Sequence, residues 1–176
     1  AAMMVNEGEA DALVTGYSRS YPSVVKPMLQ LIGKAPGISI VASTNMMMTN
    51  RGPIFFSDTA INPNPTADDI AKIAIMTANT VKLFGLEPVM AMVSFSNFGS
   101  SNHDSAVKLR EAVAYLHKYY PDLIVDGEIQ ADFALNPEML TAKFPFSKLA
   151  GKKVNTLIFP NLEAANITYK LLKEIG

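Results

Sequence analysis

The chain has 176 residues, of which 49% are hydrophobic and 18% are charged, and its formal net charge is −1 at pH 7. This composition is typical of a globular protein with a sizeable core, and a charge so close to zero predicts neither a nucleic-acid nor a membrane-surface partner. The absence of cysteine excludes disulfides, thiolate catalysis and zinc-thiolate sites, and no apolar run reaches the roughly 18 residues of a spanning helix.

The beginning of the chain is expected to hold one strand-helix unit. Residues 1–6 are predicted to end a helix that closes at Gly8, and residues 11–15 (DALVT) to form a short buried strand. Residues 23–32 place their apolar side chains on one helical face, and Gly33 ends that helix. No targeting pattern is found in the first residues. Because residues 1–5 resemble the last turns of a helix whose start is missing, and the last helix stops at 175–176 without visible completion, we expect residues 1–176 to be a fragment of a longer polypeptide.

An antiparallel hairpin is predicted next. Residues 37–48 (GISIVASTNMMM) are rich in β-branched side chains, and a three-residue turn at 50–52 leads directly into the apolar residues 54–56. Two apolar runs joined by so short a link are typical of a hairpin. We expect the three consecutive methionines to pack in the core or in an interface.

The remainder of the chain alternates helices with short strands. Thr66, with Asp69 three positions later, is predicted to cap a helix that Gly85 stops. Alternation of this kind predicts a largely parallel sheet with helices on both faces, to which the hairpin adds an antiparallel pair. The further expected elements are a strand at 89–93, a helix through 109–116, a strand at 123–125, a helix at 137–143, a strand at 154–159 and a helix that Pro160 and Asn161 open.

The stretch that joins the strand at 89–93 to the following helix carries the main candidate site. Its strand part is an uninterrupted apolar run, which is typical of a strand buried on both faces. A polar corner after a parallel strand places backbone N–H groups and hydroxyls at a helix N-terminus, where α/β proteins hold anionic ligands. The candidate ligand-binding residues of this corner are Ser94, Ser96, Asn97, Gly99 and Ser100.

Two interpretations of these polar residues stay open at the level of sequence. The corner either binds a phosphate or acyl-phosphate oxygen, or it merely caps the next helix through Ser101 or Asn102. Asn161 at the start of the last helix is a second candidate anion-binding residue, and its alternative role is an N-cap without a ligand.

The acidic residues and histidines give weaker signals. Asp126, Glu128 and Asp132 are candidates for acid-base chemistry or metal binding, but the favoured interpretation is that they accept hydrogen bonds from backbone donors around a tight turn. His103 is expected beside a helix cap and His117 near a helix C-terminus, and neither has a partner at metal-ligand spacing. No metal site is predicted.

Two basic residues near the exit of the first predicted strand, Arg19 and Lys26, are candidates for contacts with a phosphate or carboxylate. The usual glycine-rich nucleotide motifs and the G-x-S-x-G elbow do not occur in the sequence. The residues alone therefore predict an α/β lobe that binds a small anion.

Five segments carry a family resemblance: DALVTG, SDTAINPNPTADDIAKIA, MVSFSNFGSS, VDGEIQADFAL and IFPNLEAANITYK. In this order they resemble the phosphate acetyl/butyryl transferase family. The resemblance implies a fold like that of isocitrate and isopropylmalate dehydrogenases, with two α/β lobes around a cleft and dimers formed through the second lobe, to which this chain corresponds. It also implies transfer of an acetyl group between coenzyme A and phosphate.

Two departures from the family pattern favour one of its branches. The serine-arginine pair and the aspartate base of active members would lie beyond Gly176, so no catalytic residue is assigned within this chain. Phe98 stands within the corner motif where active members usually carry a basic residue, and the exit of the first predicted strand reads YSRSY where theirs is rich in threonine. Both features resemble the C-terminal domain of large NADP-dependent malic enzymes. Lys26 stands where active members tend to have arginine, and a lysine lacks the planar fork that binds phosphate in two places.

The resemblance to that domain implies a regulatory role. It implies a homodimer or higher homo-oligomer in the cytoplasm, with acetyl-CoA, or CoA and phosphate, as ligands. No cofactor is expected in this lobe, and NADP and a divalent metal would bind only to the malic-enzyme part. The alternatives are a catalytically active phosphate acetyltransferase and a purely structural oligomerisation module.

Overall fold

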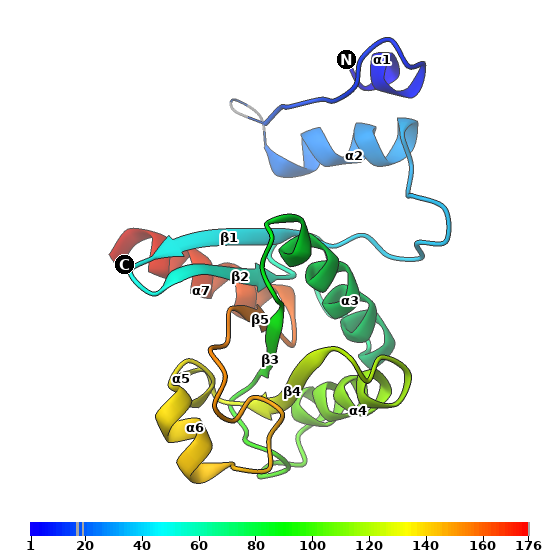
Figure 1. The fold of residues 1–176 in the computed structure, drawn as a ribbon. Coiled ribbons are helices and arrows are strands. Elements are labelled where there is room, and N and C mark those ends of the chain that lie inside the picture. The colour runs from blue at the N-terminus through cyan, green and yellow to red at the C-terminus, as the bar shows by residue number, and fades with distance from the viewer. Residues whose placement is uncertain (17, 19, 176) are drawn as a thin grey trace. The chain divides into compact units, whose positions relative to one another are not determined.

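The computed structural model describes residues 1–16, 18 and 20–175, and the chain divides into two compact units. Unit 1 comprises Ala1–Val41 and unit 2 comprises Ala42–Gly176 (Figure 1). In the described residues no helix is both long enough and apolar enough to cross a membrane.

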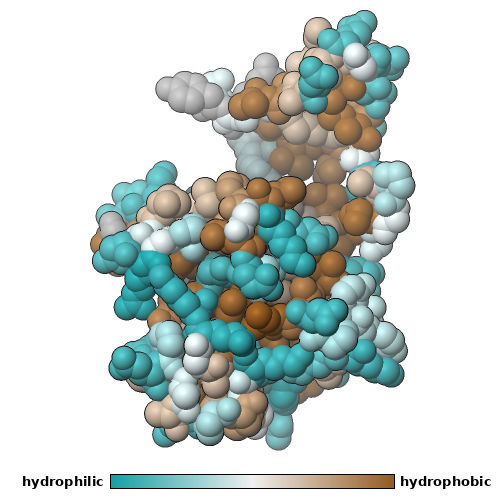
Figure 2. Space-filling view, in the orientation of Figure 1, coloured by the Kyte–Doolittle hydropathy of each residue, from teal (hydrophilic) through white to brown (hydrophobic). Residues whose placement is uncertain are grey.

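The described residues of unit 1 form two helices, α1 (Ala2–Asn6) and α2 (Tyr21–Leu31), which contact each other. The predicted strand at residues 11–15 is wrong: these residues adopt no strand, and Val14 is 97% exposed. A strand needs a neighbouring strand for its hydrogen bonds, and the described part of unit 1 offers none. Neither helix has a fully buried residue, and apolar residues gather on the visible surface of this unit (Figure 2).

Unit 2 is built on a five-stranded sheet with the order β1-β2-β5-β3-β4. The predicted hairpin is confirmed, because β1 pairs antiparallel with β2, although β1 begins seven residues later than expected. The other neighbouring strands are all parallel. The sheet is therefore largely parallel with one antiparallel pair, as predicted. Its strands are β1 (Thr44–Thr49), β2 (Gly52–Ser57), β3 (Val89–Val93), β4 (Ile124–Ile129) and β5 (Thr156–Ile158).

Helices cover both faces of this sheet (Figure 1). Ala91 and Val93 of β3 point to a core that also contains residues of α5, α6 and α7, whereas Phe55 of β2 points to the other face and contacts the ring of Phe84 at the end of α3. The five helices of unit 2 are α3 (Ala67–Leu83), α4 (Asp104–Tyr119), α5 (Ala131–Ala134), α6 (Pro137–Lys143) and α7 (Leu162–Ile175).

The predicted start of α3 is confirmed by a complete capping box. The Thr66 hydroxyl accepts a hydrogen bond from the Asp69 N–H at 3.2 Å, and the Asp69 carboxylate accepts from the Thr66 N–H at 3.0 Å and from its hydroxyl at 2.7 Å. These hydrogen bonds lower the pKa of Asp69, the one from the Thr66 hydroxyl most strongly. Reciprocal bonds of this kind satisfy two donors at the helix start.

Candidate functional site

The candidate site lies at the carboxyl edge of the parallel strands. The chain leaves β3 through the corner, residues 94–103, toward α4 on one face, and it leaves β5 through Pro160 and Asn161 toward α7 on the other. Because β3 and β5 are neighbours, the two connections diverge at a topological switch point. Open α/β sheets bind their ligands at such a point.

A buried carboxylate holds the corner in place. Glu128 is fully buried, and its Oε1 atom accepts hydrogen bonds from the Ser96 hydroxyl at 2.7 Å, the Gly99 N–H at 2.9 Å and the Arg110 Nη1 group at 2.9 Å. The Arg110 contact is also an ion pair, and a second hydrogen bond joins Arg110 to the Ser101 carbonyl. Two of the donors that the sequence assigned to a ligand are therefore occupied by a carboxylate of the protein itself.

The local geometry of β4 explains how Glu128 reaches the corner. Met92 of β3 pairs with Gly127, but Val93 pairs with Ile129, so Glu128 is the extra residue of a β-bulge. A bulge turns a strand side chain into a new direction. Gly127 is required here, since its φ is +136° and a Cβ atom would lie 2.7 Å from the Met92 carbonyl oxygen.

The other corner residues mostly bond to one another. The Asn97 N–H donates to the Ser100 hydroxyl, the Asn97 side-chain oxygen accepts from the Gln130 N–H, and the Ser94 hydroxyl accepts from the Ser96 N–H. Gly99 and Ser100 are nevertheless exposed to solvent. The structure therefore brings together the five candidate residues of the corner, with a fixed shape and an open outer side.

The remaining predicted residues lie elsewhere. Asn161 is at the same carboxyl edge, and its side-chain oxygen accepts a hydrogen bond from the Ala164 N–H at 2.9 Å, which is the arrangement of an N-cap. Lys26 is an exposed residue of α2 in unit 1, and its ammonium group contacts no partner among the described residues. Arg19 lies outside the described residues.

Phe98 turns away from the open side of the corner. It has a positive φ of 42°, and its N–H donates to the Glu128 carbonyl at 2.7 Å. Its ring packs against Phe144 and Phe146, with centroid distances of 4.9 Å and 5.0 Å. Phe98 is thus part of an aromatic cluster.

The acidic residues confirm the favoured interpretation in two cases. Asp126 accepts from the Lys148 N–H and the Ser147 hydroxyl, both at 2.8 Å, so it anchors the turn before β5. Glu128 anchors the corner, whereas Asp132 is exposed. In the described part of the chain no group of three or more histidines and acidic residues could hold a metal ion.

One predicted role is wrong, and one residue of the site was not predicted. His103 is itself the N-cap of α4, with its Nδ1 atom accepting from the Ser105 N–H at 3.2 Å, so the expectation of a cap at Ser101 or Asn102 is wrong. Arg110 was missed altogether. Its signal was its position four residues after the buried Ala106, which places it on the inward flank of the helix.

This fold and site define an open α/β protein whose polar corner lies at a topological switch point. All 176 residues match the family described as phosphate acetyl/butaryl transferase, and the chain belongs to that family. The resemblance that the five sequence segments indicated is confirmed.

Known proteins of two kinds are similar to this chain. A phosphate acetyltransferase from Thermoanaerobacterium thermosaccharolyticum is 42% identical over 99% of this chain and 55% of the relative. An NADP-dependent malic enzyme from Salmonella typhimurium is 40% identical over 98% of this chain and 22% of the enzyme. A phosphotransacetylase structure from Streptococcus pyogenes is 40% identical and superposes with a TM-score of 0.91, covering 99% of this chain and 54% of that one. The chain thus spans about half the length of the transferases it matches.

Proposed function

We propose that this chain is a transferase-type domain that binds acetyl-CoA and serves a regulatory and oligomerisation role in an NADP-dependent malic enzyme. The observation that carries the proposal is the placement of Phe98 within an aromatic cluster. The family resemblance predicts a basic residue at that point, and a cation there would stabilise the charge on a reacting acyl phosphate. A phenyl ring cannot supply this stabilisation, which favours binding over turnover.

The corner retains what ligand binding requires. Glu128 and Arg110 hold its shape. The N–H groups of Ser101 and Asn102, which immediately precede the N-cap of α4, have no acceptor among the described residues. Backbone donors at a helix start favour a phosphate group. We infer that they contact a phosphate of the acyl carrier, with Asn161 at the same edge as a further candidate. Arg19 and Lys26 are proposed as anion-binding residues on the sequence alone.

The proposal extends to the larger protein. In it this chain forms mainly the second lobe of a two-lobed, dehydrogenase-like unit, and homodimers or larger homo-oligomers assemble through this lobe in the cytoplasm. NADP and a divalent metal would bind only to the part that converts malate to pyruvate and carbon dioxide. A purely structural oligomerisation module would have the same fold with no ligand at the corner.

A second candidate function is supported by the comparisons. The identity to phosphate acetyltransferases reaches 42%, against 40% for the Salmonella typhimurium malic enzyme. A working phosphate acetyltransferase would let the CoA thiolate attack the carbonyl carbon of acetyl phosphate, with phosphate as the leaving group. A base would remove the thiol proton, and the catalytic residues would come from outside this chain.

Three measurements on the full-length protein separate these functions, one of which is the rate of malate decarboxylation with and without acetyl-CoA. Calorimetry with acetyl-CoA tests binding, and release of free thiol from acetyl-CoA in the presence of phosphate tests turnover. The regulatory function predicts binding, inhibition of malate decarboxylation and no thiol release. Thiol release would establish the active transferase instead, and the absence of any binding heat would leave the structural module.

A further inference from the structure

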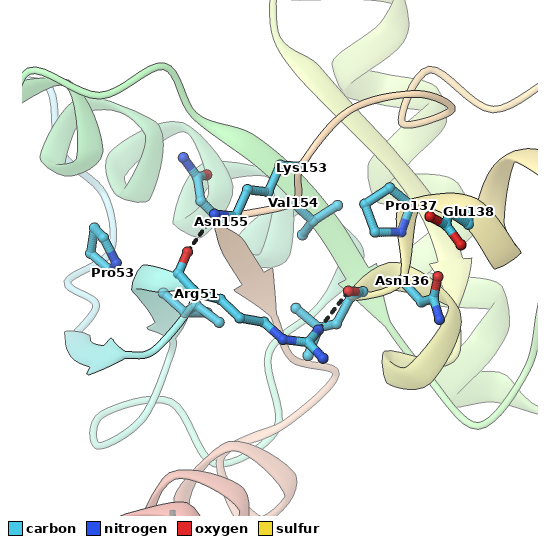
Figure 3. A pocket seen from close by; sticks show the side chains of 10 residues that line it. Arg51, Pro53, Asn136, Pro137, Glu138, Lys153, Val154 and Asn155 are labelled. Atoms are coloured by element: carbon cyan, nitrogen blue, oxygen red, sulfur yellow. Dashed lines mark hydrogen bonds between the residues drawn. The ribbon is translucent and has the colours of Figure 1, made fainter.

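A cavity of about 490 Å³ lies at the amino edge of the sheet in unit 2, opposite to the candidate site. It is bounded by the hairpin turn with the start of β2, the segment before β5, and the connection between α5 and α6 (Figure 3). Small-molecule sites usually have volumes of about 300–1,000 Å³. The lining residues include Arg51, Pro53, Asn136, Glu138, Lys153 and Val154.

The two basic residues of this cavity are held by neutral acceptors. Arg51 donates from Nη1 to the Leu135 carbonyl at 2.9 Å, and the Lys153 ammonium group donates to the Arg51 carbonyl (Figure 3). In the described part of the chain neither side chain forms an ion pair with a carboxylate. Both residues are exposed, and no carboxylate among the described residues balances their charges, which leaves them available to an anion.

The rest of the lining suits an organic anion. Glu138 is the acidic residue of the lining, so two cations and one carboxylate leave a charge of +1. The Asn136 side-chain oxygen caps α6 by accepting from the Met139 N–H at 3.1 Å, which leaves its amide N–H₂ group without a partner among the described residues. Half-buried Pro53, Leu135 and Pro137 supply apolar walls over a floor of Ile54 and Val154, which are only 8% and 4% exposed.

We propose that this cavity is a second ligand site, which binds a small organic anion with one phosphate or carboxylate group and an apolar body. The Arg51 guanidinium holds the anionic group through its planar fork, and the Lys153 ammonium group, which lies at the backbone carbonyl of Arg51, adds positive charge at the other end of that side chain. The proline and leucine walls contact the apolar body. The site is independent of the proposed acyl-carrier function, since its residues come from the opposite edge of the sheet.

Calorimetric titration with n-butyl phosphate and with inorganic phosphate, at constant ionic strength, tests the proposal. The unaltered protein should bind n-butyl phosphate, and more tightly than inorganic phosphate. The double variant R51Q/K153Q should lose about tenfold or more in affinity, because it removes two charge-assisted contacts. The matched control K152Q removes an exposed charge that does not line the cavity, and it should bind within about twofold of the unaltered protein.

Two further variants keep the outcome interpretable. R51K keeps the positive charge but lacks the guanidinium fork, so it should bind n-butyl phosphate with an affinity between those of the unaltered protein and the double variant. This conservative variant still tests the role of Arg51 if the double variant fails to fold. Gly99→Val obstructs the corner and should leave this binding unchanged. The proposal is overturned if R51Q/K153Q binds as the unaltered protein does, if no binding occurs at all, or if Gly99→Val alone abolishes it. The last result would place the anion at the carboxyl edge.

Discussion

At the scale of single residues, Glu128 decides the geometry of the candidate site. One oxygen of this fully buried carboxylate accepts from a hydroxyl, a backbone amide and an arginine, while the other, Oε2, is buried without a partner among the described residues. A buried ion pair is stabilising only relative to its broken form, because removal of one partner leaves an uncompensated charge. Loss of the Glu128 carboxylate should therefore destabilise the protein, because the Arg110 charge and the Gly99 N–H would lose their acceptor.

We expect Glu128→Gln to lower the free energy of unfolding by about 2–4 kcal/mol, since it leaves Arg110 without its counter-charge and adds a buried N–H₂ group. Urea unfolding followed by circular dichroism measures the change. The control Asp132→Asn alters an exposed carboxylate only four residues away and should change the free energy of unfolding by less than about 0.5 kcal/mol. Equal effects of the two substitutions would contradict the anchoring role of Glu128.

Gly99 tests where the ligand binds. Its φ is +89°, and, apart from the glycine and its two chain neighbours, no atom of the described residues lies within 4 Å of the position that a Cβ atom would take there. Gly99→Val should remove detectable acetyl-CoA binding in calorimetry, because the new side chain would occupy the open side of the corner. The backbone conformation adds a destabilisation of about 1–2 kcal/mol.

Gly151→Val is the matched control for this strain. Gly151 has a φ of +72° and lies outside the corner, and a Cβ atom there would likewise meet no described atom within 4 Å beyond the adjoining residues. We expect it to lower the melting temperature as much as Gly99→Val does while acetyl-CoA still binds. Loss of binding in both variants would show that strain, and not obstruction of the corner, is responsible.

At the scale of elements, the capping box at the start of α3 makes the stability of the protein depend on pH. Hydrogen bonds from Thr66 lower the pKa of Asp69 in the folded protein below its unfolded value of about 4. A lowered folded pKa means that the carboxylate contributes stability above the unfolded pKa, and that this contribution is lost as the pH falls through the folded pKa.

Asp69→Asn should therefore lower the free energy of unfolding by about 1 kcal/mol at pH 7, with a difference from the unaltered protein that shrinks as the pH falls below about 4. Urea unfolding at a series of pH values measures this difference. Asp68→Asn is the control, because Asp68 forms only an exposed pair with Lys72 and should contribute less. A difference that stays constant from pH 7 to pH 2 would be incompatible with a charged capping box.

The elements that were predicted correctly are determined by residues within the same segment of sequence. The capping residues and apolar stripe of α3 lie within one segment, and the bounds of α6 were predicted to the residue at 137–143. Apart from the N-cap of α4, which is a local choice between His103 and its two preceding residues, the predictions that failed or were missing depend on distant partners. The strand at 11–15 required a neighbouring strand, and the carboxylate of Glu128 meets Ser96 across 32 positions of sequence. The position of the corner was predictable from the sequence. The sequence did not indicate which of its hydrogen-bond donors would be occupied by Glu128.

At the scale of the whole molecule, burial differs sharply between the two units. Every residue of β3 in unit 2 is buried, whereas α1 and α2 in unit 1 contain no buried residue. Local opening requires little free energy where few apolar contacts are lost, and it approaches the global free energy of unfolding in a core strand. The amides of the two units should therefore exchange with solvent at different rates even though both are in regular structure.

Hydrogen exchange followed by mass spectrometry tests this difference in burial. We expect peptides from α2 to exchange at least about a hundredfold faster than peptides from β3 and β4 at pH 7, because the difference in opening free energy should exceed about 3 kcal/mol. The comparison of α2 with α4 controls for helix type, since α4 has five buried residues, including Leu109 and Leu116. Protection of α2 equal to that of α4 would mean that contacts made outside unit 1, such as those within a larger assembly, cover this helix.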